Sequence, residues 1–143
     1  MVTSPSSLIP SVSTVILDEF DRVVLVQRGR KPGKGLWSIP GGKVKTGETL
    51  TEAAVREAWE ETRLQVTVED ERWVLTVQGD DGNDYEIHCF EATTDDRELI
   101  PGDDAADARW VPVDALGEYP LTDGLEERIR VLISERMPPN ARR

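Results

Sequence analysis

One short segment of the chain places an arginine and three glutamates at helical spacing: Arg56, Glu57, Glu60 and Glu61. Because a helix has 3.6 residues per turn, glutamates at i, i+3 and i+4 lie on one face. Three carboxylates that converge there repel one another unless a cation lies between them. Hard oxygen ligands suit Mg²⁺ or Mn²⁺, so the spacing predicts a divalent-metal site. Taken alone, it also fits a Glu-rich helix face exposed to solvent.

The segment before the glutamates points to an anionic ligand. Arg22 to Lys45 contains seven basic residues and no acid, in a chain whose net charge is −11. A general nucleic-acid binder would be basic overall, so the charge argues against that class. Arg28 and Arg30 are the candidate phosphate ligands, because arginine makes bidentate phosphate contacts. The adjoining pair Gly41–Gly42 predicts a tight turn that brings backbone close to a ligand.

Together these residues resemble the Nudix box, G-x5-E-x7-R-E-U-x-E-E-x-G-U, in which U is a bulky aliphatic residue. The box covers 42–64, with Ala58 in place of the first U and Arg63 in place of the second glycine. The matching positions are Gly42, Glu48, Arg56, Glu57, Glu60, Glu61 and Leu64. The chain is therefore similar to Nudix hydrolases, in particular to small MutT-like or ADP-ribose pyrophosphatase-like members. The resemblance is specific over Gly35–Leu64 and looser elsewhere.

The resemblance implies a metal-dependent hydrolase that cleaves a pyrophosphate bond in a nucleoside diphosphate linked to another moiety. That substrate class includes ADP-ribose-like compounds, sugar nucleotides and nucleoside triphosphates. In this reading Glu57, Glu60 and Glu61 bind Mg²⁺, with Mn²⁺ as the alternative metal. Glu48 supports the metal cluster, and Arg56 orients a carboxylate. The alternative is a non-catalytic Nudix-like module that senses a nucleotide, but every box glutamate is present.

The general base and the substrate contacts stay open in the sequence. By resemblance, the base is either a box glutamate or an acid from a later loop, where Asp103 and Asp104 are the candidates. Those two aspartates also fit a solvated turn. Trp37 could stack on a base, although tryptophan in a small chain more often packs in the core. Short motifs that mark particular substrates in the family are not found beyond the box.

Arg63 departs from the box at the end of the expected helix. Glycine there lets the chain leave the helix with a positive φ, a conformation that is strained for arginine. The alternative is an exit rebuilt with right-handed geometry. We favour the left-handed exit, because the flanking residues Thr62 and Leu64 follow the pattern.

The remaining elements predict a single α/β domain. Ser11–Leu17 and Arg22–Gln27 are β-branched runs joined as a hairpin, and Thr49 caps a helix that ends near Thr62, with Glu52 completing a capping box. Leu64–Val68, Trp73–Val77, Tyr85–Ala92 and Arg109–Val113 are further expected strands, and a helix follows from about Thr122. The resemblance implies an α/β/α sandwich around a mixed sheet, covering 1–143 with a flexible tail at 138–143.

Composition suggests a cytoplasmic protein, and the resemblance implies that it acts on a small-molecule nucleotide. Cys89 is the single cysteine, so no intrachain disulfide forms. The N-terminus lacks the basic and apolar regions of a signal peptide. No apolar run reaches the roughly 18 residues of a membrane span. We expect no nucleic-acid or membrane partner, and the sequence leaves a homodimer open.

Overall fold

The computed structural model describes residues 8–31, 33–79, 81–102 and 104–136. Within these residues, seven strands form one mixed sheet, and helices pack against it. The strands are β1 (Leu8–Leu17), β2 (Arg22–Arg28), β3 (Trp37–Ser38), β4 (Gly41–Lys43), β5 (Thr67–Gln78), β6 (Asp84–Thr93) and β7 (Ala105–Pro112). The helices are α1 (Leu50–Thr62), the 3₁₀-helix η2 (Val113–Glu118) and α2 (Leu125–Arg136). None of these helices is long and apolar enough to cross a membrane.

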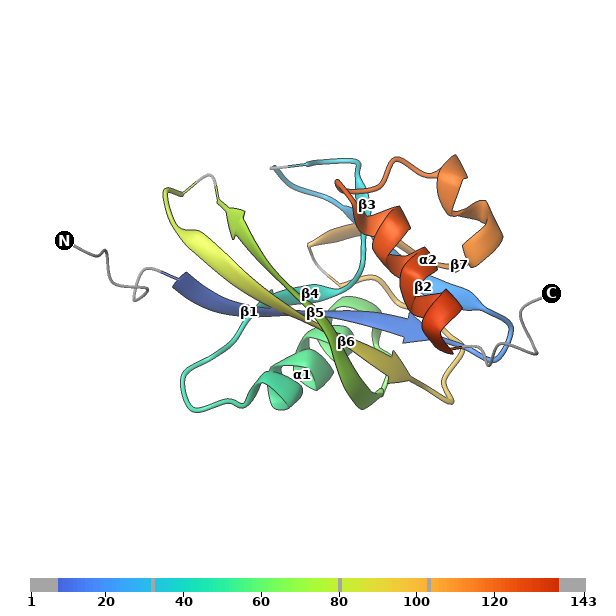
Figure 1. The fold of residues 1–143 in the computed structure, drawn as a ribbon, viewed down its shortest axis with the longest axis horizontal. Helices are drawn as coiled ribbons and strands as arrows, with labels where there is room; N and C mark the ends of the chain where they lie inside the picture. Colours follow the sequence, from blue (N-terminus) through green and yellow to red (C-terminus); the bar gives the residue numbers. More distant parts are fainter. Residues whose placement is uncertain (1–7, 32, 80, 103, 137–143) are drawn as a thin grey trace.

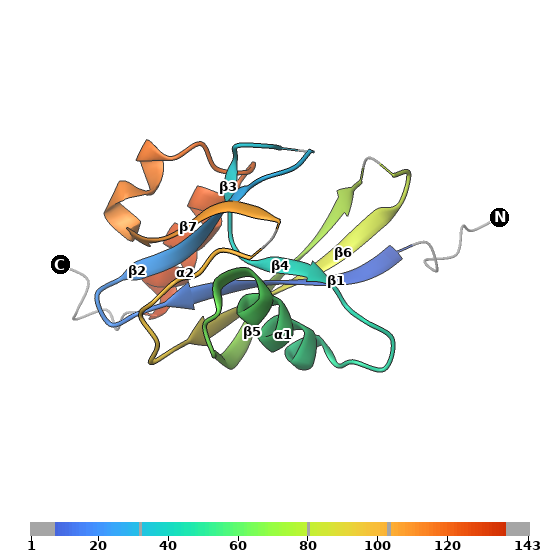
Figure 2. The ribbon, with the colours of Figure 1, turned by 180° about the vertical axis from the view of Figure 1, so that it is seen from behind.

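Apolar side chains of the central strand β1 point alternately to the two faces of the sheet, where they join separate hydrophobic cores. Val15 and Leu17 pack in one core, whereas Ile16 packs in another. Because successive strand side chains point to opposite faces, both faces of β1 need cover. Residues of η2 and α2 complete the first core, and Ala58 of α1 packs with Ile16 in the second. The two α-helices lie on opposite sides of the sheet (Figures 1 and 2), which confirms the α/β/α sandwich.

The strand order places the predicted hairpin at the centre of the sheet. The order is β3-β2-β1-β6-β5, with β4 paired to β1 and β7 paired to β2. β1 runs parallel to β6 and antiparallel to β2, with Leu17 opposite Val23. The Asp18 carboxylate closes the hairpin by accepting backbone N–H groups of Phe20 and Arg22, each at 2.9 Å.

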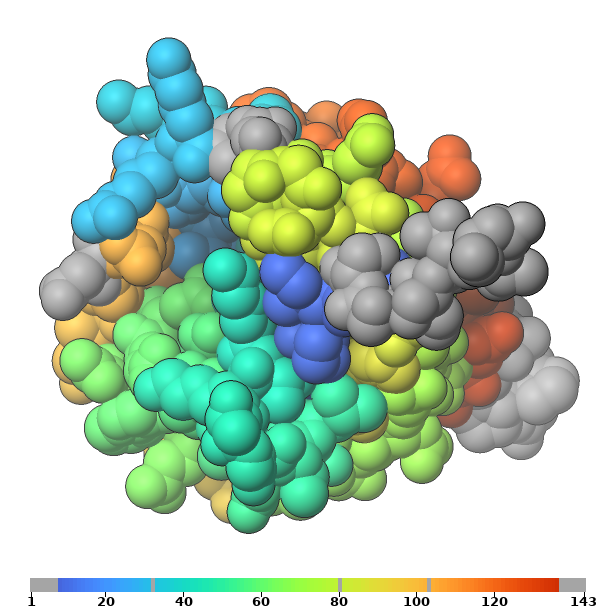
Figure 3. Space-filling model, turned by 90° about the vertical axis from the view of Figure 1, so that its left-hand side faces the viewer, coloured from blue at the N-terminus to red at the C-terminus, as the bar shows by residue number. Residues whose placement is uncertain are grey.

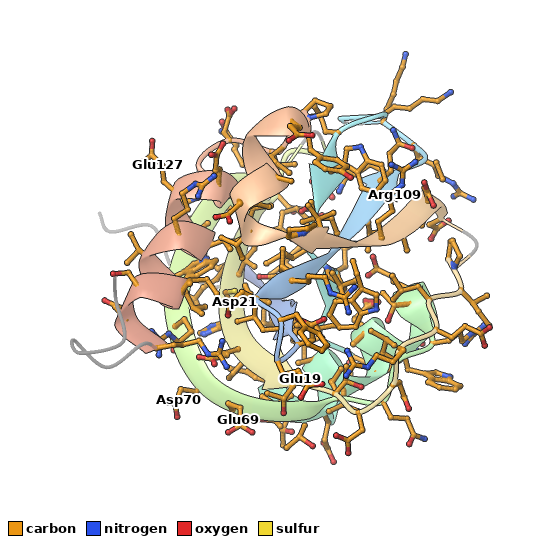
Figure 4. The ribbon with its side chains drawn as sticks, turned by 90° about the vertical axis from the view of Figure 1, so that its right-hand side faces the viewer. Glu19, Asp21, Glu69, Asp70, Arg109 and Glu127 are labelled. Carbon is orange, nitrogen blue, oxygen red and sulfur yellow. The ribbon has the colours of Figure 1, made fainter. Side chains whose placement is uncertain are left out.

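The prediction of two separate strands, Leu64–Val68 and Trp73–Val77, is wrong. β5 is continuous, with register shifts on either side of Glu71 where it pairs with β6. A β-bulge absorbs extra residues within a strand, which interrupts the alternation that marks a strand in sequence. Glu69 and Asp70 at the bulge point outward, as does Glu127 on α2 (Figure 4).

The C-terminal helix follows its expected apolar stripe but begins slightly later, at Leu125. Leu125, Ile129 and Leu132 are buried, and Ile133 packs against the same core. Their spacing places them on one face of the helix. The predicted helix end at Pro138–Pro139 and the flexible tail at 138–143 lie outside the described residues.

Candidate active site

A cavity of about 810 Å³ opens beside α1. Its walls come from the end of β2 and the loop after it, from β4, from α1 and from the start of β7. Figure 3 faces this side of the molecule, where the blue loop after β2, the orange start of β7 and the green helix surround a hollow. The residues predicted to do chemistry therefore come from segments far apart in sequence.

α1 directs its glutamates toward the cavity because its other face is apolar. Thr49 caps the helix, and Thr49 and Glu52 form the predicted capping box. Ala53, Ala54 and Ala58 are fully buried against the sheet. Val55 lies off this buried face and is 38% exposed. The three glutamates Glu57, Glu60 and Glu61 all line the cavity.

Arg56 ties the loop before α1 to the helix. Its Nε donates to Glu48 Oε2 at 2.7 Å and its Nη2 donates to Glu48 Oε1 at 3.0 Å. This bidentate contact, together with the Lys45 backbone N–H, lowers the pKa of Glu48 to about 2. Arg56 also donates to the Lys43 carbonyl at 3.0 Å. Arg56 thus holds the Glu48 carboxylate, while its role in catalysis and the support that Glu48 gives to a metal stay predictions.

Burial disfavours the charged form of two glutamates, Glu57 and Glu61. Burial raises the pKa of Glu61 to about 8, although Glu61 Oε2 accepts the Gly41 N–H at 3.0 Å. Burial also raises the pKa of Glu57, against the opposing effect of Arg56. A carboxylate removed from water gains more from a nearby cation than an exposed one does. These two side chains would therefore be stabilised by positive charge bound in the cavity.

Glu60 differs from Glu57 because its side chain is largely exposed, although both pair with Arg56. Its Oε1 lies 3.3 Å from Arg56 Nη1, and its side chain is 47% exposed. As the side chains stand, no three acidic, histidine or cysteine residues among those described are placed to hold a metal ion. The donor set nevertheless fits a hard divalent cation, since two desolvated carboxylates and a third exposed one share one wall. Glu60 would have to turn from Arg56 to join them.

Gly41 and Gly42 approach other groups closely, but they do not form the predicted turn. They begin β4, which pairs with β1 at Ser13 and Val12. A Cβ on Gly41 would overlap the Val12 carbonyl oxygen, and a Cβ on Gly42 would overlap the Glu57 carboxylate. The lack of a side chain at both positions lets β4 lie between β1 and α1. The turn prediction is wrong, because glycine is needed here for the close packing of β1 and α1 on β4 and not for a turn.

The basic segment contributes some, but not all, of its arginines to the cavity. Arg28 and Arg30 line the cavity, as does Asp104. Arg30 and Asp104 form an ion pair of 3.0 Å, with side chains 77% and 75% exposed, so it contributes little to stability. Asp103 lies outside the described residues. Arg22 belongs to the same basic segment but pairs with Asp18 at 2.7 Å and does not line the cavity.

Trp37 is a core residue, and its predicted contact with substrate is wrong. It is 5% exposed and packs edge-to-face against Tyr119, with ring centroids 5.3 Å apart. The guanidinium of Arg109 covers its ring at 5.2 Å. A ring enclosed in this way has no free face on which a base could stack.

Some cavity residues were not singled out in the sequence. Lys43 follows the double glycine, and its ammonium lies 5.7 Å from the Tyr85 ring. Gly102 packs against the end of α1, where a Cβ would overlap the Glu60 carbonyl oxygen. Its N–H donates to the Glu61 carbonyl at 3.0 Å, which fixes the loop before β7 to the helix. The proximity of Gly102 to α1 has no local sequence signal, because the contact joins distant segments.

Cys89 and His88 do not line the cavity. Burial raises the pKa of the Cys89 thiol to about 12, so it stays protonated at neutral pH. His88 lies between two carboxylates, with Nδ1 2.9 Å from Glu71 Oε1 and Nε2 2.9 Å from Glu86 Oε1. Both residues therefore have structural roles in β6.

Comparison with known proteins identifies the family. The NUDIX domain profile matches residues 7–133. The chain belongs to the NUDIX domain family. The ADP-ribose pyrophosphatase of Methanocaldococcus jannaschii is 34% identical over 102 residues, which cover 71% of this chain and 60% of that protein. A putative 8-oxo-dGTP diphosphatase of Bacillus subtilis is 33% identical over 107 residues, covering 75% of this chain and 66% of the relative.

Solved Nudix structures share the fold over most of the chain. The MutT protein from Methanosarcina mazei matches with a TM-score of 0.79 at 23% identity, over 92% of this chain and 96% of that one. The Nudix hydrolase RenU from M. smegmatis matches with a TM-score of 0.74 at 25% identity, over 91% and 88% of the two chains. The chain spans less than two thirds of several curated relatives that it matches: 60% of the M. jannaschii enzyme and 24% of a putative nudix hydrolase of Caenorhabditis elegans.

Proposed function

We propose that this Nudix protein hydrolyses a pyrophosphate bond in a nucleoside diphosphate linked to another moiety, with Mg²⁺ as its metal and Mn²⁺ as an alternative. The observation that carries the proposal is the cavity wall on which the desolvated Glu57 and Glu61 face basic side chains from β2 and its loop. Acidic groups bind a metal and basic groups bind phosphate, so one cavity suits a metal-bound anhydride.

Glu57, Glu60 and Glu61 are the proposed metal ligands, and Glu48 is their proposed support. When bound, a divalent metal neutralises phosphate charge and lowers the pKa of a coordinated water. The chain itself prepares this wall in two ways. The Gly41 N–H orients Glu61, and Arg56 holds the loop of Glu48 against α1. Catalysis of phosphoryl transfer depends mainly on such positioning and on electrostatics.

The basic residues would hold the phosphates opposite the glutamates. Arg28 and Arg30 reach the cavity from the end of β2 and its loop, and Lys43 reaches it from β4. Arginine places two parallel N–H donors on a phosphate, which fixes its direction as well as its position. Contacts of this kind would fix the position of the anhydride in the cavity, and displacement at phosphorus depends on such positioning.

A box glutamate is the better candidate for the general base. Asp104 is three-quarters exposed and is paired with Arg30, so its carboxylate is held at the cavity rim. The box glutamates lie within the wall where the metal and its water are proposed. We therefore assign proton abstraction to a box glutamate. Asp104 would instead position Arg30.

A substrate panel tests the proposal. ADP-ribose, sugar nucleotides, canonical and oxidised nucleoside triphosphates and dinucleoside polyphosphates would be incubated with Mg²⁺ or Mn²⁺. Phosphate, pyrophosphate and nucleoside monophosphate would then be measured. Metal-dependent release of monophosphate from at least one compound is expected. Nucleotide binding without hydrolysis of any compound would contradict the proposal and favour the non-catalytic sensor.

A further inference from the structure

Arg63 stands where the Nudix box has glycine, and it keeps the backbone conformation that suits glycine. Its φ is 63° and its ψ is 22°, in the left-handed region, and its N–H donates to the Trp59 carbonyl to close the helix. Arginine is uncommon in this conformation. Closing the helix does not require a side chain, because glycine does the same. Backbone strain of this kind concentrates at functional sites, which directs attention to the guanidinium.

The side chain of Arg63 lines the cavity and rests on an aromatic ring. Its guanidinium carbon is 5.4 Å from the centroid of Trp59, which is 43% exposed. Trp59 and Arg63 are four residues apart, so they lie on the same side of the helix end. A ring below the guanidinium restrains it and leaves the N–H donors at its edge available to an anion.

No described carboxylate forms an ion pair with Arg63. The other arginines near the glutamates differ: Arg56 binds Glu48, and Arg30 binds Asp104. Arg63 is also displaced from the proposed metal ligands. It lies three residues beyond Glu60 and two beyond Glu61, which is about 3 Å along a helix axis from the nearer one. An anion bound to Arg63 would therefore lie beside the metal-binding wall.

The charge of the cavity, once a divalent metal is counted, favours an anionic substrate. Its described lining carries five basic side chains against four carboxylates: Arg28, Arg30, Lys31, Lys43 and Arg63 against Glu57, Glu60, Glu61 and Asp104. Binding of a divalent metal adds two positive charges. A highly charged ligand complements such a cavity better than a less charged one.

We propose that Arg63, restrained by Trp59, binds an ionised phosphate next to the hydrolysed anhydride, and that it makes the enzyme prefer nucleoside triphosphates over ADP-ribose-like compounds. This inference rests on the proposed function and specifies its substrate class. In ADP-ribose the diphosphate is flanked by sugars on both sides, so no third phosphate reaches Arg63. Arg63 is then the residue that determines specificity, and Trp59 is a positioning residue.

The test compares Arg63→Asn and Arg63→Gly on the two substrate classes. Both replacements tolerate a positive φ and both remove the guanidinium. Loss of one charge-assisted hydrogen bond is expected to raise KM for a nucleoside triphosphate by about tenfold with kcat unchanged. KM for ADP-ribose should change less than about twofold, because the lost contact is not made there. Arg130→Gln, which removes a charge on α2 away from the cavity, should leave both values unchanged.

Trp59→Leu should raise KM for the triphosphate in the same direction, by about threefold, since restraint of the guanidinium is lost while its charge remains. A similar KM change for ADP-ribose and the triphosphate in Arg63→Asn would overturn the inference, as would no change for either. Thermal unfolding of each variant shows that the fold is retained.

A binding measurement separates this inference from the proposed function. Calorimetric titration would use a nucleoside triphosphate with non-hydrolysable methylene bridges in the presence of Mg²⁺. Wild type and Arg130→Gln should bind equally, and Arg63→Asn should bind about tenfold more weakly. Equal binding by Arg63→Asn and wild type, or no binding by wild type, would overturn the inference. Binding as expected, without hydrolysis of any substrate, would contradict only the proposed function.

Discussion

Replacing Gly42 with alanine is expected to weaken metal binding and turnover in the cavity and to leave the fold nearly intact. The new Cβ would overlap Glu57 Oε2 and crowd the rest of its carboxylate. Those atoms are the far end of a flexible side chain, so Glu57 can swing away from the new methyl group. Glu57 is a proposed metal ligand, and its displacement removes one carboxylate from the wall. Gly41→Ala is the matched comparison, since its Cβ would overlap the backbone oxygen of Val12.

The two alanine variants should separate function from stability. The φ of Gly42 is not positive, so alanine gains about 0.4–1 kcal/mol from the unfolded chain. Crowding of Glu57 offsets this gain, and we expect a net change within about 1 kcal/mol. Displacing a proposed metal ligand through a change at its neighbour should reduce metal affinity and turnover by about 10–100-fold, the range for residues that position ligands. Gly41→Ala must instead push β4 from β1, which should destabilise by about 1–3 kcal/mol.

Three measurements on the same preparations decide this. Urea unfolding gives the free energy of unfolding, a calorimetric Mn²⁺ titration gives metal affinity, and turnover is measured with Mg²⁺. Wild-type metal affinity and turnover in Gly42→Ala would refute the placement of Glu57 as a ligand. Wild-type stability in Gly41→Ala would refute the close packing of β4 on β1.

Three further outcomes follow from the geometry. Arg28→Ala combined with Arg30→Ala should raise KM by about tenfold or more, because two charged contacts to phosphate are lost; an unchanged KM would show that these arginines only face solvent. Arg63→Gly should be neutral or stabilise by up to about 1 kcal/mol in urea unfolding, since glycine relieves the positive φ; clear destabilisation would contradict the strained exit. Burial lowers the pKa of His88, but hydrogen bonds to its two glutamates raise it above 6.5 overall. Its contribution to stability is therefore present below pH 6.5 and is lost as pH rises through the folded pKa. His88→Gln should accordingly destabilise the protein more at pH 5.5 than at pH 9. Equal destabilisation at both pH values would contradict a charged His88 in the folded protein.

Local signals in the sequence predicted the helix of the site well. The capping box of Thr49 and Glu52 and the left-handed exit at Arg63 are both observed. Each depends on residues within one turn of the helix end, so neighbouring residues carry the information. The hairpin of β1 and β2 was predicted for the same reason, since two β-branched runs flank a short polar turn.

Features that depend on distant segments were predicted poorly. Gly41 and Gly42 are glycines because β1 and α1 approach them, which a local pattern cannot distinguish from a turn. Trp37 directly precedes residues that line the cavity, yet Tyr119 and Arg109 enclose its ring. The bulge in β5 breaks the alternation by which strands are recognised in sequence.

The most direct test of the central claim compares Glu60→Gln with Glu52→Gln in metal-dependent hydrolysis. Both changes remove one negative charge from α1, but Glu60 lines the cavity, whereas Glu52 caps the helix and glutamine can replace it there. On the best substrate of the panel, chelation by EDTA should abolish wild-type turnover. Glu60→Gln should lose on the order of a hundredfold or more in kcat with its fold retained, and Glu52→Gln should stay close to wild type. Near-normal turnover in Glu60→Gln, or turnover that persists in EDTA, would contradict a metal site formed by these carboxylates.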